Sequence, residues 1–121
     1  MKLSEAIRLG AMLRPQGYGY LFAYGKTCAL GAAAEAIGIY RECAEAICIH
    51  DPVAADRSLR AVWPMLESVV FDERLGRMPL RGAIMIRNDS REWTRERIAD
   101  WVEQFEAVEE PSTAQPESVT A

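Results

Sequence analysis

A run of very small residues at 28–37 constrains the fold more than any other feature of this sequence. The run reads Cys-Ala-Leu-Gly-Ala-Ala-Ala-Glu-Ala-Ile, and its largest apolar side chains, Leu30 and Ile37, share one face at helical spacing. Because Gly31 and the alanines carry little side-chain bulk, another backbone can approach this helix closely. The pattern therefore predicts a central helix with Thr27 as its N-cap.

The composition is typical of one small globular domain. The chain has 121 residues, of which 50% are hydrophobic and 26% are charged. A core of this size buries roughly two thirds of the surface of the extended chain, so folding requires neither disulfides nor a metal. We expect a single domain over residues 1–107. We expect a disordered acidic tail over 108–121, because that segment is polar and punctuated by prolines.

Three further helices have clear start or stop signals. Apolar spacing over residues 4–13 predicts a first helix that Pro15 stops. Asp51-Pro52 is a strong start signal for a later helix, which Pro64 kinks or ends. Thr94 caps a C-terminal helix with a compact apolar face. We expect this last helix and the small-residue helix to pack at the centre of the domain.

The remaining segments are ambiguous between helix, strand and loop. Residues 15–25 interleave aromatics with glycines and fit either an aromatic loop or a short irregular hairpin. Gly38 either interrupts one long helix or separates two, and residues 46–50 also fit a short strand. The best strand candidate is 83–86, closed by turn-forming residues at 88–90. The predicted fold is a mainly α, compact small helical domain with a minor β element, with an α+β domain as the alternative.

Charge and hydropathy exclude several partner classes. The chain has 14 basic and 18 acidic side chains and a net charge of -4, whereas general nucleic-acid binding requires a concentrated basic stripe. No apolar run approaches membrane-spanning length, and the N-terminus lacks a signal-peptide pattern. We therefore expect a cytoplasmic protein with no membrane partner. The three cysteines are most simply small buried hydrophobes in a reducing compartment.

One enzymatic hypothesis fits the residue types. Cys28 lies at a helix N-terminus, where free amides and the helix dipole would lower the pKa of a thiol. His50 would act as the general base, and Asn88 or Asp89 would orient its imidazole. No recognisable nucleophile motif surrounds Cys28. A cysteine-dependent hydrolase or transferase is therefore the alternative function and not the leading one.

Metal and nucleotide sites receive less support from the spacing. The three cysteines and the single histidine would complete a Cys3His zinc shell, but Cys28 has no close cysteine partner in the sequence. The glycines at 17–25 form neither a Walker loop nor a dinucleotide fingerprint. We expect no metal and no cofactor.

Aromatic residues on the glycine-punctuated loop form the candidate binding site. Tyr18, Tyr20 and Tyr24 can stack a ligand or anchor a partner protein, and Arg87 can add an anion contact. A purely structural interpretation stays open, in which the tyrosines cover the core and Arg87 is an ordinary surface charge. The leading functional hypothesis is a non-enzymatic domain that binds a protein partner or a small molecule.

Two segments of the chain carry a family resemblance. They are Thr-Cys-Ala-Leu-Gly-Ala-Ala at 27–33, and Asn-Asp at 88–89 followed by Trp-Thr-Arg-Glu at 93–96 and Ile-Ala-Asp-Trp at 98–101. Together they resemble small bacterial and phage-associated proteins of unassigned function that carry a Cys-Ala-Leu-Gly-Ala helix and an Asn-Asp turn. The resemblance implies a self-contained cytoplasmic domain of phage or mobile-element origin, and it implies no activity. A homo-oligomeric structural or inhibitory protein is a third possibility, which an exposed apolar patch would indicate.

Overall fold

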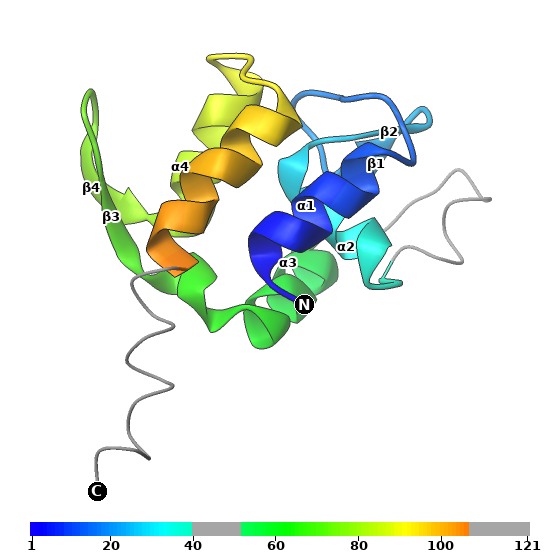
Figure 1. Cartoon of the computed structure of the whole chain (residues 1–121), viewed down its shortest axis with the longest axis horizontal. Coiled ribbons are helices and arrows are strands. Elements are labelled where there is room, and N and C mark those ends of the chain that lie inside the picture. Colours follow the sequence, from blue (N-terminus) through cyan, green and yellow to red (C-terminus); the bar gives the residue numbers. More distant parts are fainter. Residues whose placement is uncertain (40–51, 107–121) are drawn as a thin grey trace, which may run out of the picture.

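The computed structural model describes residues 1–39 and 52–106, which form a mainly helical domain (Figure 1). The α-helices of this part are α1 (Leu3–Ala11), α2 (Ala29–Ala36), α3 (Pro52–Val62), α4 (Leu80–Asp89) and a C-terminal helix over 95–106, with a 3-10 helix η1 at Pro64–Glu67. The strands form two antiparallel pairs, β1 (Phe22–Ala23) with β2 (Lys26–Thr27) and β3 (Val69–Asp72) with β4 (Gly76–Pro79). The two hairpins lie toward opposite ends of the long axis (Figure 1). The predicted fold class, mainly α with a minor β element, is confirmed.

Helix α2 lies inside the domain, as its small residues predict. Residues 29–34 are all buried, and backbone approaches the helix from two sides. A Cβ atom added at Gly10 of α1 would collide with the carbonyl group of Ala32, and one added at Gly31 would collide with the carbonyl oxygen of Leu21. The absence of side chains at these two glycines therefore brings α1 and the segment before β1 into direct contact with α2.

The N-terminus of α2 differs by one residue from the prediction. Cys28, and not Thr27, is the N-cap, and its Sγ accepts a hydrogen bond from the Gly31 N–H at 3.4 Å. Thr27 instead ends β2, where its side-chain oxygen accepts a hydrogen bond from Arg95 at 2.9 Å. A long-range contact thus occupies the hydroxyl group that the local pattern assigned to capping.

Gly38 ends α2. Its φ of +90° lies in the left-handed region that favours glycine. The Ile39 N–H donates to the Ala34 carbonyl at 2.9 Å, and the Gly38 N–H donates to the Glu35 carbonyl at 3.0 Å. These two bonds are the Schellman motif. Gly38 therefore stops α2. The question whether it separates two helices depends on residues 40–51, which lie outside the described residues.

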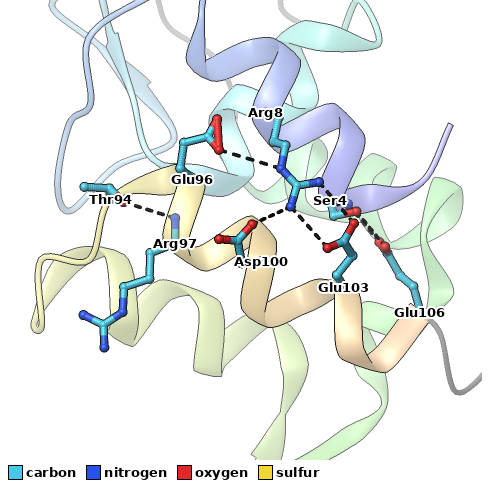
Figure 2. A network of polar contacts seen from close by, with 8 residues as sticks. All are labelled: Ser4, Arg8, Thr94, Glu96, Arg97, Asp100, Glu103 and Glu106. Carbon is cyan, nitrogen blue, oxygen red and sulfur yellow. Dashed lines mark hydrogen bonds and ion pairs between the residues drawn. The ribbon is translucent and has the colours of Figure 1, made fainter.

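The C-terminal helix lies alongside α1, antiparallel to it, and charged side chains join the two helices (Figure 2). Near the start of α1, the Ser4 N–H and hydroxyl both donate to the Glu106 carboxylate, at 2.8 and 2.6 Å. In the middle, Arg8 pairs with Asp100 at 2.6 Å and with Glu103 at 3.3 Å. The buried Glu106 carboxylate satisfies a free N–H group of the first turn of α1 and complements the positive end of its dipole.

Arg95 binds the opposite end of α1. Its Nη2 donates to the carbonyl oxygens of Ala11 at 3.3 Å and Arg14 at 2.7 Å, and its side chain is buried. The last carbonyls of a helix lack internal partners and carry partial negative charge. The C-terminal helix therefore supplies an anion to the N-terminus of α1 and a cation to its C-terminus.

The predicted strand at 83–86 is wrong, because these residues lie inside α4. A short apolar run does not distinguish a buried strand from a buried helix. The buried residues of α4 recur at helical spacing and include Leu80, Ala83, Ile84 and Arg87. Because one of them is an arginine, the sequence alone does not show them as an apolar helix face. Asn88 and Asp89 belong to the same helix, so the predicted turn at 88–90 is also wrong.

Several other expectations have definite outcomes. Helix α1 ends at Ala11, before Pro15, and α3 begins at Pro52 and ends before Pro64. Both alternatives for residues 15–25 are partly correct: residues 17–21 form a loop, and a short hairpin follows in which β1 and β2 pair across a turn with positive φ at Tyr24 and Gly25. The expectations for residues 46–50 and for the tail at 108–121 fall outside the described residues.

None of the helices within residues 1–39 and 52–106 has the length and apolar character that crossing a bilayer requires.

Replacement of Gly10 by alanine tests the close contact of α1 with α2. The added methyl group would collide with backbone of α2, which cannot move without displacing the helix. We expect the free energy of unfolding of Gly10→Ala to fall by about 1–3 kcal/mol, measured by urea denaturation. Gly82→Ala in α4 is the control, because its Cβ meets only the flexible end of Met78 at 3.2 Å, so its stability should stay the same or rise. Equal destabilisation of the two variants would contradict the proposed contact.

Candidate functional site

A pocket of about 260 Å³ lies between α2, α3, α4 and the loop before β1. Its lining combines apolar side chains with three charged groups and comprises Gly19, Tyr20, Leu21, Cys28, Leu30, Asp56, Arg81, Met85 and Asp89. Sites for small molecules in proteins are concave and mostly apolar, with a few polar groups that orient the ligand. This pocket is therefore the candidate functional site.

Helix α4 forms one wall of the pocket. Arg81, Met85 and Asp89 all line it, and their spacing of four residues places them along one face of the helix. The buried residues at 80, 83, 84 and 87 lie on the other side and face the core. Helix α4 thus presents one side to the pocket and another to the core, while Cys28 and Leu30 of the core form part of the opposite wall.

The charged groups of the pocket differ in their partners. The Asp56 carboxylate forms an ion pair with Arg60 at 3.0 Å. The Asp89 carboxylate accepts hydrogen bonds from the Gly19 N–H at 2.9 Å and from Asn88 at 2.7 Å. Arg81 makes no hydrogen bond or ion pair with any residue in the described ranges, and its Nε is shielded from solvent without a partner. Among its described lining residues, the pocket therefore contains one partly buried cation, Arg81, without a partner in the described part of the chain.

Asn88 fixes the pocket wall to the rest of the domain. Its side chain is fully buried. Its Oδ1 accepts from the Ala29 N–H at 3.1 Å and from Gln16 at 2.8 Å, and its Nδ2 donates to the Gly17 carbonyl at 2.9 Å and to Asp89. One amide group therefore joins α4 to the first turn of α2 and to the loop before β1. This is a positioning role, different from the imidazole-orienting role of the catalytic hypothesis.

Cys28 lies in the wall of the pocket as a buried thiol. Its side chain is 5% exposed, and burial raises its pKa to about 11, opposed in part by the hydrogen bond from the Gly31 N–H. A nucleophilic cysteine requires a shift in the other direction. His50, the proposed base, lies outside the described residues, so the catalytic arrangement stays a hypothesis without support from the thiol.

The structure also bears on metal binding, within its described ranges. In residues 1–39 and 52–106, no group of three or more His, Cys, Asp or Glu side chains is placed to hold a metal ion. The other residues of the Cys3His hypothesis, at 43, 48 and 50, fall in the undescribed segment. The expected absence of a metal stays a prediction.

The three tyrosines of the predicted binding site occupy different positions. Tyr20 is half-buried and lines the pocket. Tyr24 is 91% exposed at the tip of the β1–β2 turn, and its ring meets that of Tyr20 edge to face with centroids 6.3 Å apart. Tyr18 is exposed and does not line the pocket. Only Tyr20 is therefore placed to contact a molecule inside it.

Arg87 is buried on the core side of α4, so its interpretation as a surface charge is wrong. Its side chain is 2% exposed, with the guanidinium 3.8 Å from the ring centroid of Trp101 and Nη1 3.1 Å from Asp72 Oδ1. Arg91 also binds Asp72, through two hydrogen bonds of 2.9 Å. These bonds and two turn N–H groups hold the pKa of Asp72 well below its usual value. Arg87 serves the fold, and its charge does not face the pocket.

Sequence reasoning missed Arg81, Met85 and Asp56. Arg81 and Met85 are not recognisable because the sequence predicts a strand at 83–86. In a strand, positions 81, 85 and 89 do not form a separate face. In a helix these positions form a stripe. Asp56 carries no sequence signal of its own, because it reaches the pocket only through the packing of α3.

Comparisons with protein-family models, with curated proteins and with solved structures each found no match. The function of the chain is therefore inferred from its own residues, and above all from those that line the pocket.

Alkylation of Cys28 tests the environment of the thiol. With a pKa of about 11 in the folded state against 9.0 for an exposed thiol, Cys28 should react slowly with iodoacetamide in the native protein at pH 7–9. Rapid reaction should appear only in urea or as the pH approaches the folded pKa. Mass spectrometry of the Cys28 peptide separates its labelling from that of the other two cysteines.

The same shift predicts a dependence of stability on pH. The folded state holds the thiol proton more tightly than the unfolded state, so this contribution to stability is complete below about pH 9 and is lost as the pH rises toward about 11.

Fast alkylation of Cys28 in the native protein near neutral pH would contradict the buried thiol and would revive the nucleophile hypothesis.

Proposed function

We propose that this protein is a non-enzymatic binding domain that takes a small molecule in the pocket beside α4. The observation that carries the proposal is the combination, in a pocket of about 260 Å³, of apolar walls with a guanidinium, Arg81, that has no partner within residues 1–39 and 52–106. The terminal nitrogens of this guanidinium, unlike its Nε, are not among the atoms shielded from solvent, and they make no hydrogen bond within residues 1–39 and 52–106. A ligand with an acceptor group would give these nitrogens a partner.

The elements around the pocket favour a preformed site. Asn88 holds the loop at residue 17 and the start of α2 to α4 through hydrogen bonds of 2.9 and 3.1 Å. The contact of Gly31 with the Leu21 backbone fixes the same loop from the other side. A preformed site loses little conformational entropy when it binds, which favours affinity for small ligands.

The cysteine-dependent hydrolase or transferase receives less support from the same residues. Burial raises the pKa of Cys28 to about 11, so the nucleophilic thiolate is a minor species at neutral pH. In the binding proposal Cys28 has two simpler roles, as the N-cap of α2 and as part of an apolar wall.

A variant that fills the pocket tests the proposal. A panel of aromatic and aliphatic molecules with about ten non-hydrogen atoms each would be titrated into the isotope-labelled protein, and the amide chemical shifts would be recorded by NMR. We expect the shifts to cluster at Gly19, Leu30 and Met85. Met85→Trp should weaken binding at least about tenfold, because the larger ring takes up pocket volume.

Leu9→Trp is the matched control for this variant. Leu9 is 42% exposed and Met85 is 41% exposed, but Leu9 lies on α1 and does not line the pocket. Its substitution should leave affinity unchanged. Scattered shifts in the titration, or equal affinities in the two tryptophan variants, would contradict a binding function for this pocket.

A further inference from the structure

We infer that the ligand of this pocket is a small organic anion whose charged group pairs with Arg81 and whose apolar body lies against Met85, Leu21 and Leu30. The inference rests on the proposed function, since it names the chemical class of the molecule that the pocket takes.

Arg81 differs from the other shielded arginines of the described residues. Those that are buried or half-buried and have carboxylate or carbonyl partners are Arg8, Arg14, Arg60, Arg87, Arg91 and Arg95. Arg81 is also half-buried, but it has no such partner within residues 1–39 and 52–106; its shielded, unpaired Nε is a feature that it shares with Arg87. Guanidinium groups form their strongest hydrogen bonds with carboxylate and phosphate groups. An anionic ligand would give Arg81 the kind of partner that the fold gives the others.

The two carboxylates of the pocket have partners of their own. Asp56 forms an ion pair with Arg60 at 3.0 Å, and because Arg60 also pairs with Glu67 at 2.6 Å, it offsets part of the Asp56 charge. Asp89 is held by the Gly19 N–H and by Asn88. It also lies two turns further along α4, about 12 Å from Arg81 at about 1.5 Å of rise per residue. Among the described lining residues, Arg81 therefore supplies the positive charge that an anion would meet.

The remaining lining suits the apolar part of such a molecule. Met85 lies on α4 between the two charged residues, and Leu21 and Leu30 come from the loop and from α2. Methionine adapts readily to ligands of different shape. A molecule with a carboxylate at one end and a short aromatic or aliphatic chain therefore matches both the charge and the apolar surface of the pocket.

The experiment compares three probes of nearly equal shape in the wild-type protein. They are 3-phenylpropanoate, its uncharged amide 3-phenylpropanamide, and the cation 3-phenylpropylamine, each titrated at low salt and followed by amide chemical shifts. We expect the acid to bind at least about tenfold tighter than the amide, because only the acid forms a charge-assisted pair with Arg81. The amine should bind more weakly than the acid.

Two arginine variants assign the preference to Arg81. Arg81→Gln should lower the affinity for the acid to that for the amide, and should leave the affinity for the amide unchanged. Because Arg81 has no partner in the described part of the fold, its loss should not change the melting temperature. Arg77→Gln removes the same charge from an exposed position of β4 outside the pocket, and should leave the affinity for the acid unchanged.

The outcomes separate this inference from the proposed function. Equal binding of acid and amide, tighter binding of the amine, or equal effects of the two arginine variants would overturn the anionic ligand while leaving a pocket that binds small molecules. If none of the three probes binds, the anionic ligand is overturned. The wider panel and the Met85→Trp variant then decide the proposed function separately.

Discussion

The close approach of backbone to α2 is the constraint on which the rest of the structure depends. Gly10 of α1 lies against Ala32, and Leu21 of the loop lies against Gly31, where no side chain could be placed. These two contacts set the positions of α1 and of the loop, and the loop then forms one wall of the pocket. Close packing of this kind tolerates little change in volume, so the small residues of α2 determine the geometry of the site from a distance.

Long-range polar contacts hold the other helices to this centre. The C-terminal helix provides Glu106 to the start of α1 and Arg95 to its end, and so complements both ends of the helix dipole. On α4, Asn88 binds the start of α2, and Arg87 pairs with Asp72 of β3. Each of these side chains is buried, and each would be costly without its partner. The fold therefore depends on contacts between residues that lie far apart in the sequence.

The candidate site depends on a difference between the two sides of α4. One side carries Arg87, which pairs with Asp72 through Nη1 although its Nε has no partner, and the other carries Arg81, which has no hydrogen bond or ion pair in the described residues. Two arginines of α4 thus have different roles, because Arg87 pairs with an acidic side chain of the β3–β4 hairpin and Arg81 lines the pocket.

The sequence by itself determined that the chain is mainly helical, that a small-residue helix lies at its centre, and where prolines bound α1 and α3. These features depend on local conformational preferences and on apolar spacing within one segment. Only the tertiary structure decided that residues 83–86 are helical, that Arg87 is buried, and that Arg81 lines a pocket. The physical reason is that the burial and pairing of a charge depend on groups from distant parts of the sequence. The local sequence around the charged residue does not indicate which groups these are.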